Sequence, residues 1–468
     1  MLWPILVVGI QVFVGAACLT FVQPQTLRQW PRAWKLALAF LMGTCIPTLT
    51  LLILLQLGFR FAPWLWGVFG MVALCILFVR RRDLSALWTE PSQKHASPSP
   101  LQRYVLNIGL AALFAWNVVS AICLPTTDYD GLVIWTYRDR VLLREETLYT
   151  PNLRDPERIA PMKRHPYFLP VLEASYCAWT GFRYSLAHMP HLTFYLIYIL
   201  LVSGSARLLR SGALAHALLA ALLLMPAMSV QFWLEGPREP VIGILTLAAT
   251  GCLVLWIERQ SLAPLLLGGI LVSAAHQTKI EGTAVAAGYF LAALLYSLAV
   301  GHERKKHLSA TILVFILAVF VAVPWEIFKS QIPHTSQEYR FTEGFGTGWK
   351  ERLPYVLPVA WMTGSEVFFR PELYGFAPMV LLAALVLLVR HRPPFRWFLA
   401  CLPAVVCLAG IVAIYLVRQT QLEAIRNLTF SRRFVCVLPA LIFGVLTALD
   451  RGMNPLSSGE KSRCSEKL

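Results

Sequence analysis

The amino-acid sequence predicts an all-α polytopic membrane protein with about 13 transmembrane helices. The chain has 468 residues, of which 57% are hydrophobic and only 14% are charged. Soluble domains average about 45–50% apolar and about 25% charged residues. Many of the apolar runs reach the roughly 18 residues that a helix needs to cross a bilayer. The polar stretches between them are too short to form a soluble domain of ordinary size.

Apolar runs separated by polar loops predict the spans one after another. The expected spans are residues 2–22, 36–58, 62–80, 104–124, 186–206, 212–231, 239–257, 262–277, 281–300, 308–329, 374–390, 397–417 and 433–449. Two semi-apolar segments, 166–182 and 353–368, are expected to form short or interfacial helices. The first span has no basic start and no small-residue cleavage site, which favours a retained helix over a signal peptide.

Lysine and arginine residues in the short loops predict the orientation of the spans. The basic loops lie at residues 28–35, 80–82, 207–210, 304–306 and 390–396, and the expected spans bring all of them to one face. Positive charge in short loops marks the cytoplasmic side. The net charge of +16 therefore reflects membrane topology, and it does not indicate nucleic-acid binding.

Composition shifts divide the chain into three parts. Residues 1–102 hold the first three spans and a linker rich in proline and serine, residues 103–450 form the main membrane module, and residues 451–468 form a basic cytoplasmic tail. The ten cysteines are scattered, mostly within apolar runs, and none form a Cys-x-x-Cys pair. This distribution argues against a disulfide framework and against a thiolate zinc site.

An acidic pair, Asp128 and Asp130, directly follows the span 104–124. Two carboxylates at a membrane surface repel each other, so holding them together indicates a role in binding a cation or accepting a proton. The alternative interpretation is a loop or helix cap, because Asp is common in both.

Further polar groups are expected on the face opposite the basic loops. From Trp135 to Glu146, apolar and charged residues mix at helical spacing, which predicts a helix lying in the membrane interface. The loops at 233–240, 276–282 and 418–433 carry cations that the topology rule does not explain. Recognition of phosphate or carboxylate would explain them.

Several short motifs follow one another along residues 103–450. They are Asp130 with Trp135 five residues later, His165-Pro166-Tyr167, Leu172-Glu173-Ala174, Arg238-Glu239-Pro240-Val241, Thr278-Lys279-Ile280-Glu281-Gly282, Val323-Pro324-Trp325 and Ser431-Arg432-Arg433-Phe434 with Leu438-Pro439. In this order they resemble the GT-C membrane glycosyltransferases, in particular the bacterial protein mannosyltransferase/aminoarabinose transferase group (glycosyltransferase family 39-like). The chain departs from the usual pattern at Asp128, since the group often has one acidic residue at the Asp130 position without an Asp two residues before it, and at Glu239, where Asp is commoner.

The resemblance implies a GT-C-like fold and an inverting transfer of a sugar from a polyprenyl-phosphate carrier to an acceptor. The acceptor would be a lipid, a glycan or a protein, and transfer would take place on the periplasmic face of a bacterial inner membrane. A carboxylate at the bilayer rim can act as base for the acceptor hydroxyl, and cations can stabilise the phosphate leaving group.

Roles follow for particular residues. Asp130 is expected to be the general base, with Asp128 as its partner, and the pair is a possible site for a divalent metal ion. The expected substrate- or phosphate-binding residues are Arg138, His165, Arg238, Glu239, Lys279, Glu281, Arg432 and Arg433.

Other interpretations remain open at this point. Lys279 and Glu281 can simply pair across a turn, and Arg432 and Arg433 can anchor a helix end at the headgroups. A lipid-linked sugar flippase or secondary transporter is a second function class, and a polysaccharide polymerase or ligase is a third. Transporters place polar groups near the bilayer midplane, often in two related halves, whereas here the polar groups crowd one face and no repeat is visible.

Overall fold

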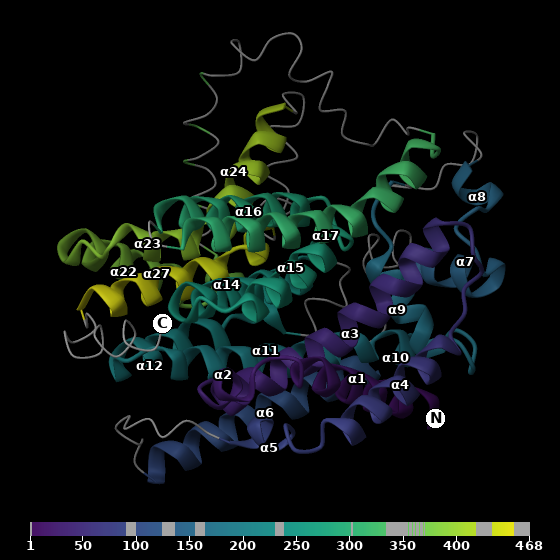
Figure 1. Ribbon diagram of the computed structural model, residues 1–468, viewed down its shortest axis with the longest axis horizontal. Helices are drawn as coiled ribbons and strands as arrows, with labels where there is room; N and C mark the ends of the chain where they lie inside the picture. Colours follow the sequence, from purple (N-terminus) through teal and green to yellow (C-terminus); the bar gives the residue numbers. More distant parts are fainter. Residues whose placement is uncertain are drawn as a thin grey trace.

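The computed structural model describes residues 2–89, 100–123, 136–154, 164–229, 238–300, 303–333, 370–417 and 433–453, with five isolated positions between 354 and 368. All regular elements in these stretches are helices (Figure 1). In the first half they are α1 (Leu2–Leu19), α2 (Pro24–Arg28), α3 (Arg32–Gln56), α4 (Leu65–Val79), α5 (Ser85–Trp88), α6 (Pro100–Cys123), α7 (Tyr137–Glu145), α8 (Pro151–Arg154), α9 (Phe168–Cys177), α10 (Tyr184–Ala187), α11 (Met189–Leu208) and α12 (Gly212–Leu223). In the second half they are η2 (Pro226–Met228), α14 (Glu239–Arg259), α15 (Leu262–His276), α16 (Glu281–Ala299), α17 (Arg304–Ser330), α21 (Pro371–Tyr374), α22 (Ala377–His391), α23 (Phe395–Phe398), η4 (Leu399–Cys401), α24 (Leu402–Val417), η6 (Phe434–Cys436) and α27 (Leu438–Met453).

Seven helical stretches in the described residues are long and apolar enough to cross a membrane. They are Leu2–Leu19, Arg32–Gln56, Tyr184–Leu208, Glu239–Arg259, Glu281–Ala299, Arg304–Ser330 and Phe395–Ala413. Five shorter apolar helices accompany them: Leu65–Val79, Ile108–Cys123, Gly212–Leu223, Leu262–His276 and Ala377–His391. The protein is thus an all-helical, multi-pass membrane protein, as predicted. The expected count of about 13 spans is not reached by these length and composition criteria, because several helices are shorter than a full bilayer crossing.

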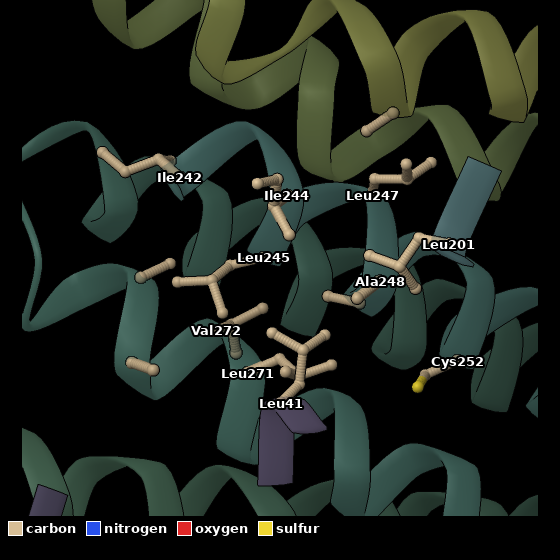
Figure 2. Packing of buried hydrophobic residues seen from close by; sticks show 14 of the residues in the cluster. Leu41, Leu201, Ile242, Ile244, Leu245, Leu247, Ala248, Cys252, Leu271 and Val272 are labelled. Atoms are coloured by element: carbon tan, nitrogen blue, oxygen red, sulfur yellow. The ribbon is translucent and has the colours of Figure 1, made fainter. Parts of the chain in front are cut away.

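Helix α14 lies at the centre of the bundle. Every residue from Glu239 to Ile257 is buried, and α11, α15, α16 and α27 all pack against it. Figure 2 shows the packing around it, where Leu245 and Ala248 of α14 lie among side chains of α11, α15 and α3. A helix that is apolar on all sides belongs in such a position.

The N-terminal helices pack through glycines. Helix α1 crosses α3 so closely that a Cβ on Gly15 would lie 1.6 Å from the carbonyl oxygen of Ala39. The same holds on the facing helix, where a Cβ on Gly43 would lie 1.6 Å from the carbonyl oxygen of Gln11. Small residues of this kind let two membrane helices bring their backbones together. Helix α3 also packs against α11, α15 and α17.

Helix α17 presents a wide apolar face to the outside. Ile316, Phe320 and Ile327 on it are 56%, 76% and 58% exposed. A large exposed apolar surface of this kind fits contact with lipid chains, because a water-exposed one would be costly.

The two ends of the bundle differ in their polar contacts. At one end, which we call the basic end, Asp450 accepts hydrogen bonds from the backbone N–H groups of Arg210 (3.0 Å) and Ser211 (2.8 Å). Arg451 there contacts the Glu258 carboxylate and donates to the carbonyl oxygen of Leu208 (3.2 Å). The opposite end, where α7, α8 and α9 lie in Figure 1, carries the charged side chains described next.

Candidate functional site

Seven of the ten predicted site residues can be placed. Asp128, Asp130 and Arg432, together with the metal site expected at the two aspartates, lie outside the described residues. No group of three or more His, Cys, Asp or Glu side chains is arranged to hold a metal ion in the part of the chain that the structure describes. The remaining candidates are Arg138, His165, Arg238, Glu239, Lys279, Glu281 and Arg433.

Lys279 lies in the turn between α15 and α16 and reaches the first residue of α14. Its Nζ atom lies 2.5 Å from Oε1 of Glu239 and 3.9 Å from Oε1 of Glu281. Both carboxylates stand in the first turn of their helices, where the helix dipole favours a negative charge. The turn depends on Gly282, because a Cβ there would lie 1.9 Å from the carbonyl oxygen of Ala275.

Arg433 joins the same group from the far end of the sequence. Its Nε atom lies 3.4 Å from Oε1 of Glu281, and the residue is only 8% exposed. Arg433 directly precedes η6, whose Val435 carbonyl oxygen would lie 2.3 Å from a Cβ on Gly243 of α14. The glycine therefore lets η6 approach the central helix, which brings Arg433 to the ends of α14 and α16.

Arg238 forms a second cluster beside the first. Its Nη2 atom lies 3.0 and 3.2 Å from the two carboxylate oxygens of Glu173 in α9. Its Nη1 atom lies 2.6 Å from Nε2 of His191 in α11, which in turn lies 3.1 Å from Oε1 of Glu173. Arg238 and Glu239 are neighbours in sequence, so the start of α14 connects the two clusters.

Arg138 extends the two clusters along the segment before α9, and we call the whole arrangement the network. Its Nη1 atom donates to the carbonyl oxygen of His165 (3.1 Å), and its guanidinium lies 4.8 Å from the centre of the Tyr167 ring. Burial lowers the pKa of His165 well below its usual value, and the positive charges of Arg138, Lys279 and Arg433 lower it further. The imidazole is therefore neutral at pH 7, with Arg138, Lys279 and Arg433 as the cations that act on it.

Three members of the network were not predicted as site residues. They are Asp139, Glu173 and His191, all buried. Burial alone would raise the pKa of Glu173, but Arg238 and His191 outweigh it and hold that pKa below the usual value. Burial and the adjacent Glu173 carboxylate raise the pKa of Asp139 well above the usual range. For Glu173 and His191, the available sequence signal is an ionisable residue within a mostly apolar stretch, which is costly without a role.

The arrangement gathers four basic side chains and three carboxyl groups at one end of the helices. The cations are Arg138, Arg238, Lys279 and Arg433, and the carboxylates are Glu173, Glu239 and Glu281. Carboxylates beside a buried cation fix its position, and a cation fixed in this way can stabilise the charge of an anion such as a phosphate.

The comparisons with known proteins found no relative. No protein-family model matches this chain, and no curated protein or solved structure matches it either. The resemblance to GT-C glycosyltransferases therefore depends on the motif residues alone, and among them Glu173, Arg238, Glu239, Lys279, Glu281 and Arg433 take part in the network.

Proposed function

We propose that this protein is a membrane glycosyltransferase that moves a sugar from a polyprenyl-phosphate donor to an acceptor with inversion. The observation that carries the proposal is the convergence of three sequence-distant motifs in one buried ion network. Arg238-Glu239, Lys279 with Glu281, and Arg433 meet at the same ends of α14 and α16.

The cations would serve the leaving group. When the bond between sugar and phosphate breaks, negative charge develops on the phosphate oxygens, and fixed cations in a poorly hydrated site stabilise that charge strongly. Lys279 and Arg433 are both largely buried and both held by carboxylates. They are our assignment for the phosphate-binding pair, with Arg138 and Arg238 next to them.

The base belongs to a segment that precedes the network in sequence. Asp130 is our assignment for the group that accepts the proton of the acceptor hydroxyl, with Asp128 as its partner or as a ligand for a divalent metal. Helix α7 begins seven residues after Asp130. Its first turn already contributes Arg138 and Asp139 to the network, which supports a common location.

The finer topology belongs to the same proposal. About 13 spans in a GT-C-like arrangement, with α7 in the membrane interface, would put the network on the periplasmic face of a bacterial inner membrane. The basic loops would then face the cytoplasm. Arg451 and the 207–210 loop already meet at the end of the bundle opposite the network, in agreement with this orientation.

Transport is the competing function. Transporters bind their substrates near the bilayer midplane, between broken helices. Here the described ion pairs of the network lie at the first turns of α14 and α16, which favours chemistry at a membrane surface. A polysaccharide polymerase or ligase would use the same surface and differs only in its donor and acceptor.

The decisive test is sugar transfer by the purified protein in detergent, where no sealed compartment exists. A panel of polyprenyl-phosphate monosaccharides serves as donors, and release of polyprenyl phosphate is measured. We expect Asp130→Asn to lose transfer by at least a hundredfold and Arg433→Met to raise KM for the donor. Arg390→Met is the matched control, since this arginine lies in the last turn of α22 and away from the network.

Two results would overturn the proposal. Full transfer by both Asp128→Asn and Asp130→Asn would remove the assigned base. Movement of a lipid-linked sugar across sealed vesicles, without release of polyprenyl phosphate in detergent, would identify a transporter instead.

A further inference from the structure

Helix α7 is fastened by charged side chains in its first turn. Arg138 points to the backbone of His165, and Asp139 points to the cluster around Glu173. Asp139 and Glu173 are each only 1% exposed. Helix α7 packs mainly against α9, so this carboxyl lies in the contact between the two helices.

The titratable and charged groups facing Asp139 come from four parts of the chain. They are Glu173 and Cys177 of α9, Tyr167 just before α9, Arg238 at the start of α14, and His191 of α11 behind Glu173. Its own helix supplies Arg138, whose guanidinium is directed at the carbonyl oxygen of His165.

These surroundings can balance one negative charge but not two. Arg238 is already paired with Glu173 at 3.0 Å, and His191 contacts both of them. A second ionised carboxylate in this buried group would be left without compensation, which costs several kcal/mol. A carboxylic acid avoids that cost, because its O–H can donate a hydrogen bond to a neighbouring carboxylate.

We propose that Asp139 is a positioning residue that works in its neutral form. Its carboxyl O–H donates to Glu173 and so holds α7 against α9, which keeps Glu173 directed at Arg238. Through Arg238, this contact fixes the start of α14 and the Glu239–Lys279 pair. The inference deepens the proposed function, and its consequence for transfer depends on that function, but the fastening of α7 does not.

If Asp139 works as a neutral acid, its replacement by Asn should be tolerated, whereas the same replacement of a residue that acts as a base should not. The amide of Asp139→Asn also donates a hydrogen bond and cannot ionise, so this variant should keep α7 in place. A residue that acts as an ionised base loses its role when it becomes an amide, as we expect for Asp130→Asn. Asp139→Ala removes the donor and should release α7.

The test is the amide hydrogen-exchange protection of residues 137–145 in the full-length protein in detergent, at pH 6 and pH 9. In the wild type, we expect protection to fall at least tenfold at pH 9, after correction for the intrinsic exchange rate, because Asp139 ionises. In Asp139→Asn, residues 137–145 should stay protected at both pH values. In Asp139→Ala, they should be protected at neither. Asp83→Asn is the control, since Asp83 lies on a partly exposed turn and pairs with Arg80.

The wild-type measurement needs no variant, so it decides the matter even if a substitution prevents folding. Unchanged wild-type protection between the two pH values would overturn the proposal. So would an Asp139→Asn protein that resembles Asp139→Ala at pH 6. In transfer assays, Asp139→Asn should keep kcat within threefold and extend the activity to higher pH. If no donor is ever turned over, the proposed function fails while the exchange result still stands by itself.

Discussion

Nζ of Lys279 lies 2.5 Å from Oε1 of Glu239, and this contact joins the turn between α15 and α16 to the first residue of α14. Forty residues separate the two in sequence. Both are almost completely buried, so neither charge can be satisfied by bulk water. Their pairing therefore controls both the position of the Lys279 ammonium and the stability of this end of the bundle.

Replacing one member of this pair should cost far more unfolding free energy than expected from the cost of replacing both members together. Glu239→Gln leaves a buried ammonium with reduced compensation, and we expect a loss of about 3–5 kcal/mol in unfolding free energy. Lys279→Met should cost a similar amount, whereas the double variant should cost much less than the sum. Unfolding in mixed micelles, followed by circular dichroism, gives the coupling energy through the double-mutant cycle.

The matched control is an ion pair of similar length in a more exposed place. Lys329 and Glu326 of α17 lie 3.1 Å apart, with side chains that are 29% and 52% exposed. Glu326→Gln should change the unfolding free energy by less than about 1 kcal/mol. Equal losses at both pairs would show that burial does not determine the strength of the Lys279 contact.

His165 should make the protein sensitive to acid. Its pKa lies below its usual value because of burial and the facing cations, so the unfolded chain binds the proton more readily than the folded one. The stability contributed by neutral His165 is thus present above about pH 6.5 and is lost as the pH falls below it, by up to about 1.4 kcal/mol per pH unit. In His165→Gln, the melting temperature should change less between pH 5 and 7.5 than in the wild type. Parallel curves of melting temperature against pH for the two proteins would contradict this.

The crossing of α1 and α3 should not tolerate a single added methyl group. Gly15→Ala and Gly43→Ala each place a Cβ 1.6 Å from a backbone oxygen of the facing helix. Backbone cannot rotate away as a side chain can, so we expect each variant to lose at least about 1–3 kcal/mol or to dissociate α1 from α3. Gly9→Ala is the control in the same helix, because nothing lies within 4 Å of a Cβ there. In thermal unfolding in detergent, Gly9→Ala should melt at a higher temperature than Gly15→Ala and Gly43→Ala.

The ion cluster at the basic end should affect stability without affecting binding of the proposed donor. Asp450 is fully buried and is paired with Arg451 at 3.0 Å. Asp450→Asn should lower the unfolding free energy by about 3–5 kcal/mol while leaving KM for a polyprenyl-phosphate sugar unchanged below the new melting temperature. A raised KM in this variant would indicate that the two ends of the bundle are coupled.

The helical membrane class could be predicted because it depends on local composition. Runs such as 239–257 are apolar over a bilayer length, and α14 is found there with only its C-terminal boundary shifted. The span expected at 433–449 instead begins as η6 and continues as α27 from Leu438, since Pro439 fits only the first turn of a new helix. The division of the chain at residue 102 stays a prediction.

The contacts within the network were less accessible from the sequence. Arg238 and Glu239 can be recognised together because they are adjacent, but the Glu173 carboxylate that pairs with Arg238 lies 65 residues away in sequence. Nothing local distinguishes His191 in α11 from His188 one turn earlier. Asp139 looked like one charge among several on a mixed helix, and its burial depends on how α7 packs against α9. Such roles come from long-range packing, which local patterns do not specify.

The contacts at the basic end also determine the order in which parts of the protein can complete their folding during synthesis. Arg210 and Ser211 leave the ribosome about 240 residues before Asp450, the acceptor of their backbone N–H groups. Glu258 is likewise synthesised well before Arg451, the residue with which it pairs. During synthesis α11, α12 and α14 must therefore persist in the membrane with polar groups awaiting their partners. The arrival of α27 completes them, so a nascent chain halted after α24 would present an unfinished surface to membrane chaperones and proteases.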